Sequence, residues 1–312
     1  MNYTDPKNSA HRGEPLDSKD GLSVVACETC GFKHVTPLPT AADLAKLYEH
    51  EFYTETKPHY FAHVEEDLPW WNMHFDNRFS LFEKHTSQRK LLDIGSGPGY
   101  FLKRGKERGW DVIGFEPSKQ AAEYSQKHGV TVVQNFFSQE KALPYGPFDA
   151  IHMEMVLEHI PYPYEFLKGA YSLLNPGGII CVVSPNDYNP FQIALRKNHG
   201  FEPWWVSPLQ HINYFDTQTM QTTLAKVGFD IVDVLATFPI EIFLLMGDNY
   251  VGNDELGRAC HIKRKRLEHA LFKIFENDDM NNFYRSCAKV GVGREFMVLG
   301  KKPVLSGRAK AH

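Results

Sequence analysis

The chain has 312 residues, a formal net charge of −4 and a pI near 6.4. Its 42% hydrophobic and 23% charged residues are ordinary for a soluble globular protein, and no apolar run is long enough to span a membrane. The acidic balance argues against a nucleic-acid partner, since proteins that neutralise phosphates usually carry a basic face. The polar N-terminus is unlike a signal peptide, and the five cysteines fit a reducing compartment, so we expect a cytoplasmic location.

Residues 1–22 are polar and are expected to be mobile. The Cys27-Glu28-Thr29-Cys30-Gly31 segment that follows has the spacing of half a zinc ribbon, but a structural zinc needs four ligands and a second C-x-x-C is missing. Several histidines follow at spacings that match no standard zinc site: His34, His50, His59 and His63. We therefore expect Cys27 and Cys30 to form a metal-free turn, with a zinc site as the alternative.

Large apolar side chains at three- and four-residue steps predict a helix over 67–84. Strand and helix patterns then alternate. The expected strands are 90–93, 110–115, 130–134, 148–153 and 178–184, and the helices between them are 99–108, 118–128 and 163–174. Such alternation predicts an α/β fold with a doubly wound parallel sheet and helices on both faces.

The C-terminal part departs from simple alternation. A helix over 217–227 and a strand over 229–237 are followed by a final strand over 294–301. The residues between the last two strands, with a helix over 258–276, predict an inserted lid, a substrate wall or a contact between copies of the chain. We divide the chain into an N-terminal segment, a main domain, an insertion and a tail, with these bounds: 1–66, 67–238 plus 292–303, 239–291 and 304–312.

The first strand of the main domain runs into a glycine-rich loop, Asp93-Ile94-Gly95-Ser96-Gly97-Pro98-Gly99-Tyr100. Glycines here permit a tight turn and the close approach of a ligand to the backbone. Glu116 ends the next strand, about 20 residues on, where an acid can accept hydrogen bonds from ribose hydroxyls. The third glycine comes too early for a dinucleotide fingerprint, and there is no G-K-[ST] of a P-loop. The acid before the glycines suits a ligand that carries a positive charge.

This D-x-G-x-G-x-G pattern resembles the first motif of class I S-adenosylmethionine-dependent methyltransferases. The resemblance implies a Rossmann-like seven-stranded sheet whose last strand is antiparallel between its two predecessors. It also implies S-adenosylmethionine as the cofactor. The residues it places around the cofactor are Asp93, Gly95, Ser96, Gly97, Gly99, Tyr100, Glu116, Asn135, Phe136, Glu154 and Met155.

The segment from Phe148 to Ile160 is similar to the family's F-D-x-I…V-L-E-H stretch. It would bring Glu154 and Met155 beside the cofactor and His159 to the edge of the pocket. A histidine there can take a proton from a hydroxyl or an amine at neutral pH, or it can serve only to hold the loop.

The segment after the 178–184 strand combines aromatic faces with polar tips, as a sugar or a small polar ring would need. We expect the substrate to contact Tyr188, Trp204, Trp205, Asn213 and Tyr214. His211 is the first candidate for a general base; alternatively it joins this segment to the neighbouring strand.

These observations predict methyl transfer to a small polar metabolite or a sugar, nucleotide-linked or in a surface polysaccharide, with a hydroxyl oxygen as the favoured acceptor. A nucleic-acid or protein methyltransferase of the same fold is one alternative, although the N/D-P-P-Y/W motif of exocyclic amine methylation is absent. A catalytically silent scaffold is the other, although the glycines and Glu116 are intact. The sequence leaves the oligomeric state open.

Overall fold

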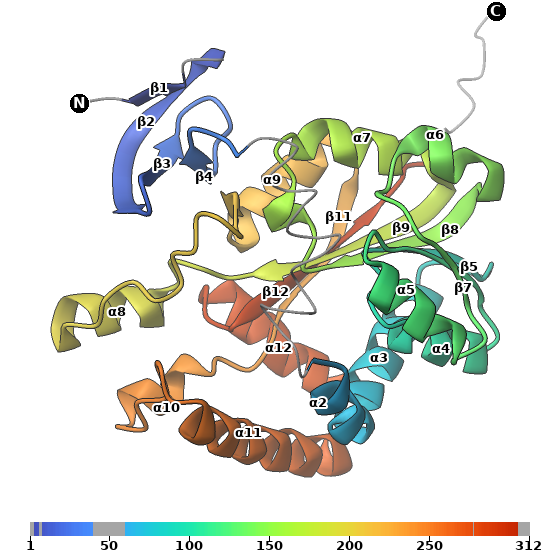
Figure 1. The fold of residues 1–312 in the computed structure, drawn as a ribbon. Coiled ribbons are helices and arrows are strands. Elements are labelled where there is room, and N and C mark those ends of the chain that lie inside the picture. The colour runs from blue at the N-terminus through green and yellow to red at the C-terminus, as the bar shows by residue number, and fades with distance from the viewer. Residues whose placement is uncertain (1–2, 6–7, 40–59, 277, 305–312) are drawn as a thin grey trace, which may run out of the picture.

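The computed structural model describes residues 3–5, 8–39, 60–276 and 278–304. Its centre is a seven-stranded sheet in the order β11-β12-β9-β8-β5-β6-β7 (Figure 1). The strands are β5 (Lys90–Ile94), β6 (Asp111–Phe115), β7 (Thr131–Val133), β8 (Phe148–Glu154), β9 (Leu174–Pro185), β11 (Asp230–Ala236) and β12 (Glu295–Lys301). Strands β5 to β9 are parallel, whereas β12 runs antiparallel between β9 and β11. This confirms the predicted doubly wound sheet and its antiparallel last strand.

Helices cover both faces of this sheet, as predicted. Helices α7 (Pro163–Leu173) and α9 (Thr217–Val227) pack on one face, and α3 (Leu68–Glu83), α4 (Tyr100–Glu107) and α12 (Asp279–Lys289) lie on the other. Helix α5 (Lys119–Gln126) lies beside β7. Shorter helical segments are α2 (Tyr60–Glu66), α6 (Gln139–Ala142), η2 (Leu143–Tyr145), η3 (Leu157–His159) and α10 (Glu241–Leu245). No helix in the described part of the chain is both long and apolar enough to cross a membrane.

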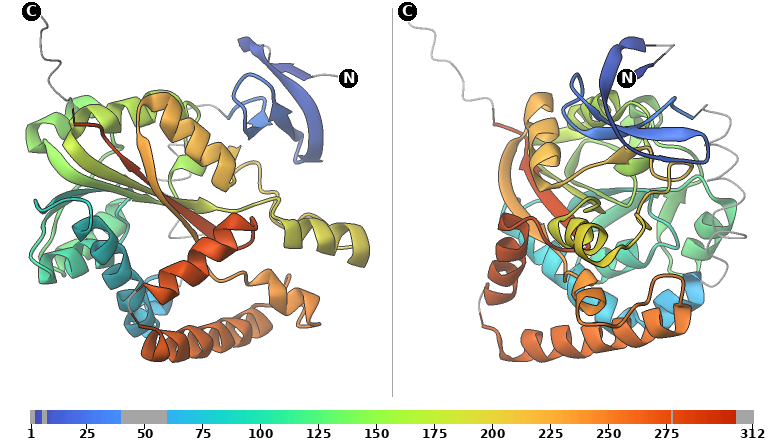
Figure 2. Two further views of the ribbon diagram at one scale, coloured as in Figure 1. Left: turned by 180° about the vertical axis from the view of Figure 1, so that it is seen from behind. Right: turned by 90° about the vertical axis from the view of Figure 1, so that its left-hand side faces the viewer.

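A second, antiparallel sheet lies beside the main one (Figure 2), in the order β1-β2-β3-β4-β10. It comprises β1 (Tyr3–Asp5), β2 (Asn8–Lys19), β3 (Leu22–Cys27), β4 (Lys33–Thr36) and the distant β10 (Asn213–Tyr214). For residues 3–5 and 8–22, the expectation of a mobile segment is therefore wrong. Strand β2 has no apolar pattern of its own, but it pairs from Gly13 to Lys19 with β3, which is anchored in the core through the buried Val24 and Val25.

Helix α8 (Pro190–His199) was not expected from the sequence, and in Figure 1 it projects from the body of the molecule. The sequence nevertheless contains local signals for the start and the end of this helix. The Asn189 side chain caps the helix by accepting hydrogen bonds from the Phe191 and Gln192 N–H groups at 2.9 and 3.0 Å. Proline at the first helical position and the left-handed Gly200 at the end complete the usual start and stop signals.

The inserted segment contains α11 (Asp254–Ile274), which is joined to the main domain by a buried polar network. Glu268, with 0% of its surface exposed, accepts hydrogen bonds from Trp70 Nε1 at 2.8 Å and from the Tyr284 hydroxyl at 2.7 Å. Arg264 Nε donates to the same carboxylate at 3.2 Å. Although burial alone would raise it, the Arg264 guanidinium holds the pKa of Glu268 at about 2. One carboxylate thus connects α11 to α3 and α12.

Replacing Glu268 with glutamine is expected to destabilise the protein by about 3–5 kcal/mol, because the buried Arg264 loses its counter-charge. The free energy of unfolding in urea measures this loss. Glu255→Gln, at an exposed position in the first turn of the same helix, is the control and should change stability by no more than about 0.5 kcal/mol. Equal effects of the two substitutions would show that Glu268 does not anchor α11.

Candidate functional site

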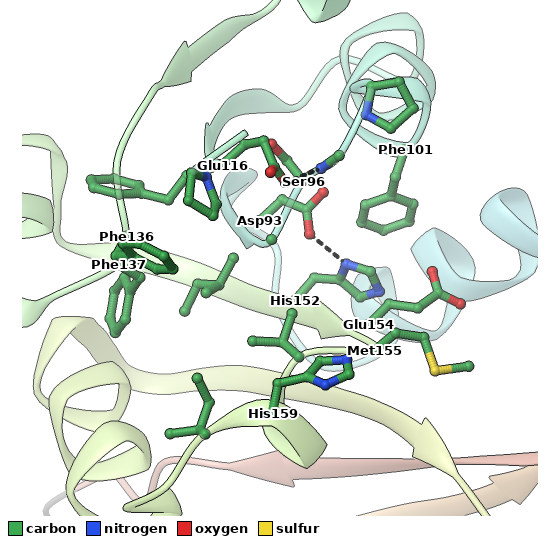
Figure 3. A pocket seen from close by; sticks show the side chains of 18 of the residues that line it. Asp93, Ser96, Phe101, Glu116, Phe136, Phe137, His152, Glu154, Met155 and His159 are labelled. Atoms are coloured by element: carbon green, nitrogen blue, oxygen red, sulfur yellow. Dashed lines mark hydrogen bonds and ion pairs between the residues drawn. The ribbon is translucent and has the colours of Figure 1, made fainter. Parts of the chain in front are cut away.

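A cavity of about 770 Å³ lies at the carboxyl ends of β5, β6 and β8 (Figure 3). Parallel strands deliver the residues that follow them to one edge of the sheet, where ligands of doubly wound folds bind. Its walls are mainly apolar, and a few polar groups converge on it, as in small-molecule sites. Helices α2 and α3 supply one wall through Val64, Trp71 and Phe75.

The loop after β5 forms one side of the cavity, through Gly95, Ser96, Gly97 and Pro98. Gly95 has a φ of 73°, and a Cβ there would lie 2.5 Å from Val156 Cγ2. Gly99, with a φ of 79°, precedes α4, and its Cβ would lie 2.8 Å from the Ser125 Cβ. Both positions need glycine for the conformation and for the space. Gly95 lines the cavity, whereas Gly99 is not among the described lining residues and lies against Ser125 of α5.

Glu116 holds this loop against the end of β6. Its carboxylate is 5% exposed and accepts hydrogen bonds from the Gly97 N–H at 2.9 Å and the Ser118 N–H at 2.8 Å. Burial raises the pKa of Glu116 to about 7, although both backbone donors oppose this shift. Each carboxylate oxygen accepts only one of these bonds, which leaves acceptor capacity for hydroxyl groups in the cavity.

The remaining predicted cofactor residues from the first three strand ends differ in position. Asp93, Ser96, Tyr100 and Phe136 line the cavity, and Phe137 lines it beside Phe136. The buried Ser96 Oγ has no hydrogen-bond partner among the described residues. Asn135 is not among the lining residues; its side-chain oxygen instead accepts a hydrogen bond from Lys141. Asn135 as the adenine-binding residue stays a prediction.

A buried chain of polar groups forms the floor of the cavity. Arg78 donates to the Glu154 carboxylate at 2.9 and 3.1 Å, and also to His152 Nε2 at 2.8 Å. Because arginine only donates, His152 must carry its proton on Nδ1, which it donates to Asp93 at 2.7 Å. Burial and Arg78 lower the pKa of His152 to about 3, so the ring is neutral. The network fixes Asp93 and Glu154 below the cavity (Figure 3).

Arg78 and His152 were not among the site residues predicted from the sequence. A signal for Arg78 existed, since it lies between Phe75 and Phe79 on the apolar stripe of α3, where a charge requires a buried partner. No comparable signal marked His152. It occupies an inward position in a strand, and its partners come from the packing of α3 on β8 and from the pairing of β8 with β5.

The loop after β8 closes another side of the cavity. Met155 has a φ of 55°, which is uncommon for a residue other than glycine, and it lines the cavity together with His159. His159 Nδ1 donates to the Gln210 carbonyl at 2.6 Å, so Nε2 carries the lone pair. Glu158 lies behind it, buried, with Oε1 at 3.7 Å from His159 Nε2. Burial raises the pKa of Glu158 to about 7.

His211 lies next to His159, with ring centroids 5.2 Å apart, and its Nδ1 is 3.5 Å from an Asp187 carboxylate oxygen. The ligand atoms of Glu158, His159 and His211 all lie within 4.8 Å of one another. His211 does not belong to the described lining of the cavity, whereas His159 does. Two histidines and two carboxylates therefore form a cluster at the edge of the cavity, and His159 is the histidine that lines it.

The five residues expected to contact substrate lie behind this wall. Trp205 and Tyr214 are 3% and 1% exposed and pack with Val24 and Val35 of the second sheet, with Tyr188 and Trp204 against them. Asn213 donates to the Leu157 and Ile160 carbonyls at 3.0 and 2.8 Å and so supports the His159 loop. The pairing of β10 with β4 places Asn213 and Tyr214 in the second sheet. Their role as substrate contacts stays a prediction.

Comparison with known proteins agrees with this geometry. A family model described as a methyltransferase domain matches residues 63–234, more than half of the chain. The C-methyltransferase NovU of Streptomyces niveus is 26% identical over 148 residues, which cover 46% of this chain and 33% of NovU. A ubiquinone biosynthesis O-methyltransferase of Caulobacter vibrioides is 34% identical over 127 residues, or 39% of this chain and 50% of that enzyme. The chain thus spans a third to a half of the length of these curated relatives.

The fold has solved counterparts. The crystal structure of a SAM-dependent methyltransferase from Archaeoglobus fulgidus is similar with a TM-score of 0.50 and 19% identity, covering 78% of this chain and 99% of that chain. The matched region contains the glycine loop, Glu116 and the β8 loop described above. The chain belongs to the family described as a methyltransferase domain, and it shares its fold with this SAM-dependent methyltransferase of known structure.

Proposed function

We propose that the protein transfers a methyl group from S-adenosylmethionine to a hydroxyl oxygen of a small polar metabolite or a sugar. The observation that carries this proposal is the convergence of the glycine loop, Glu116 and His159 on one cavity. When bound, the cofactor supplies a methyl group already activated on a sulfonium. The protein then has to bind the acceptor, orient it towards the methyl group and exclude water. It also has to accept one proton.

The residues of the cavity fit this cofactor. Gly95 and Gly97 line the cavity without side chains, and Glu116 offers acceptors for ribose hydroxyls. Phe136 offers an apolar surface for adenine. Burial and the charge of Glu154 raise the pKa of Asp93, so a cationic group beside Asp93 is favoured because it stabilises the ionised carboxylate.

We assign the general base to the histidine pair, with His159 in contact with substrate and His211 behind it. The lining position of His159 supports this order, and the hydrogen bond from its Nδ1 to the Gln210 carbonyl orients the ring. Nε2 would accept the hydroxyl proton. Glu158 and Asp187 can then stabilise the positive charge that the histidine pair acquires, since both carboxylates lie within 4 Å of a histidine nitrogen.

The relatives support a small-molecule acceptor but differ in the acceptor atom. One is named as a C-methyltransferase, and another is named as an O-methyltransferase of ubiquinone biosynthesis. A base beside the cavity suits a hydroxyl, whose proton must leave as the carbon–oxygen bond forms. The apolar cavity rim, with Ile160, Tyr162 and Phe166, suits the face of a ring.

Binding of S-adenosylhomocysteine is expected to depend on the charge of Glu116. Ribose hydroxyls need the ionised carboxylate, whose pKa is about 7 in the free protein. Affinity should therefore be constant above pH 7 and fall by up to about tenfold per pH unit below it. Calorimetry over roughly two pH units on either side of this value measures the profile.

Glu116→Gln should weaken binding and remove this pH slope, whereas the exposed Glu140→Gln should leave both unchanged. A wild-type protein that gives no binding heat at high concentration would refute the cofactor proposal. An unchanged slope in Glu116→Gln would place the titrating group elsewhere.

His159→Ala is expected to lower kcat by about 100-fold or more for a hydroxyl acceptor, because the proton loses its acceptor. His211→Ala should cause a smaller loss. Release of S-adenosylhomocysteine, measured over a panel of glycosides, nucleotide sugars and phenols, gives the rates. Both variants should keep wild-type affinity for S-adenosylhomocysteine. Full turnover in His159→Ala, with a large loss in His211→Ala, would reverse the two roles.

A further inference from the structure

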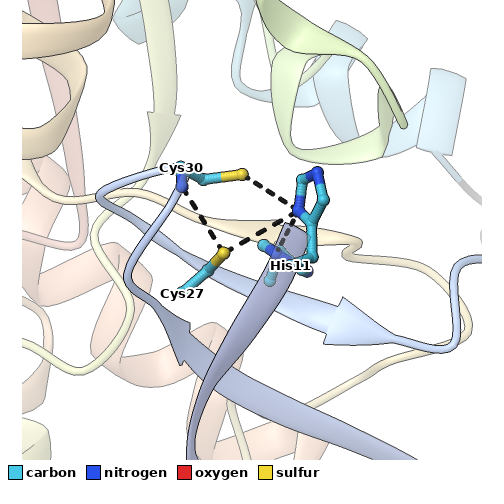
Figure 4. A group of neighbouring side chains, drawn as sticks. His11, Cys27 and Cys30 are labelled. Carbon is cyan, nitrogen blue, oxygen red and sulfur yellow. Dashed lines mark hydrogen bonds between the residues drawn. The ribbon is translucent and has the colours of Figure 1, made fainter. Parts of the chain in front are cut away.

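Four side chains that can bind a metal ion converge in the second sheet, away from the cofactor cavity. His11 comes from β2, Cys27 ends β3, Cys30 lies in the following turn and His34 comes from β4 (Figure 4). Their ligand atoms all lie within 4.8 Å of one another. Cys27 and His34 are buried, and His11 and Cys30 are half-buried.

The spacing of these atoms matches a tetrahedral zinc site. Bonds of about 2.3 Å to sulfur and about 2.0–2.1 Å to nitrogen place tetrahedral ligand atoms roughly 3.3–3.8 Å apart. His11 Nδ1 lies 3.3 Å from Cys30 Sγ, 3.7 Å from Cys27 Sγ and 3.2 Å from His34 Nε2. All three distances are thus close to the edges of one coordination tetrahedron.

Hydrogen bonds alone do not account for this arrangement. A ring nitrogen has either one N–H or one lone pair, yet His11 Nδ1 faces three polar atoms at once. His34 Nδ1 donates to the Val35 carbonyl at 2.9 Å, which leaves the lone pair on Nε2, the atom that faces His11. A bond of this kind to the outer nitrogen orients metal-binding histidines. A cation between the four atoms would satisfy all of them together.

The turn between the two cysteines has a geometry that supports thiolate ligands. The Cys30 N–H points at Cys27 Sγ at 3.4 Å, and Gly31 N–H donates to the Cys27 carbonyl at 2.9 Å. The left-handed Gly31, with a φ of 79°, lets the chain reverse directly after Cys30.

We propose that His11, Cys27, Cys30 and His34 form a structural Zn²⁺ site. Four protein ligands close the coordination sphere, which is the pattern of structural rather than catalytic zinc. Two thiols release their protons to solvent on binding, so the two thiolates balance the charge of the ion. This differs from the metal-free turn expected from the sequence. The histidines that the sequence suggests as further ligands all follow the cysteine pair. His11 precedes the pair and is brought close to it by the pairing of β2 with β3.

The proposed site also supports the wall of the cofactor cavity. His34 is the register partner of Asn213 in β10, and the Val35 N–H donates to the Ile212 carbonyl at 2.7 Å. The Ile212 N–H in turn donates to the Glu158 carbonyl at 2.7 Å. Zinc at His34 would thus stabilise the strand that holds the loops of His159 and His211. The cofactor loop belongs to the other sheet and does not depend on this contact.

The first experiment uses the whole wild-type chain expressed with zinc. Elemental analysis should find one zinc per chain, and replacement by Co²⁺ should give intense visible bands of a tetrahedral site with a thiolate charge-transfer band in the ultraviolet. The same cobalt spectrum in reduced, metal-stripped protein would support the site even if zinc is lost on purification. Zinc below stoichiometry together with no such spectrum would overturn the proposal, as would a Cys27–Cys30 disulfide that forms in place of metal binding.

Variants test the ligand set. Cys30→Ser should weaken the thiolate band, His11→Asn should lower zinc affinity, and Cys287→Ser, on α12, is the control that should keep wild-type metal content. A Cys30→Ser spectrum identical to that of the wild type would contradict the assignment. If a variant does not fold, the cobalt spectrum of the wild-type protein is the test of the proposed site. Metal-free protein should bind S-adenosylhomocysteine within a few-fold of the zinc form; a large loss of affinity would place the metal in the cofactor cavity instead.

Discussion

Parallel strands that share one sheet must end at the same edge, and the candidate site depends on this constraint. Strands β5, β6 and β8 place the glycine loop, Glu116 and the Met155 loop around one cavity, although these residues are far apart in the sequence. The bond from the Gly97 N–H to Glu116 then fixes the first loop against the second strand. The cofactor side of the cavity is therefore built mostly from backbone and is specified by few side chains.

The floor of the cavity depends on one buried guanidinium. Arg78 lies between a neutral histidine and a carboxylate, and its donors fix the His152 tautomer and, through it, the orientation of Asp93. Such a network is costly to bury unless every member has a partner. Here helix α3 supplies the charge and strands β5 and β8 supply the partners. The acids below the cavity are thus held by packing between secondary-structure elements that are not neighbours in the sequence.

The two sheets meet where the acceptor side of the cavity is formed. Strand β10 belongs to the second sheet, yet the residues just before it contact His159 and Glu158. The aromatic residues of this segment pack with Val24 and Val35 of the second sheet. The second sheet therefore acts as a support for the histidine pair, and a metal ion in it would influence the geometry of the acceptor side without contacting the cofactor.

The resemblance to class I methyltransferases implied the antiparallel last strand, and the tertiary structure shows the strand order. The sequence by itself determined the alternating strands and helices of the main sheet and the glycine loop with Glu116. These are set by apolar runs, glycine positions and spacing, which act locally or through the general geometry of doubly wound folds. Only the tertiary structure decided the pairing of β2 with β3, the separation of the aromatic segment from the cavity, and the partners of His152. The approach of His11 to Cys27 and Cys30 was likewise decided there. Each of these depends on contacts that no local sequence pattern specifies, so that tertiary packing selects the partner.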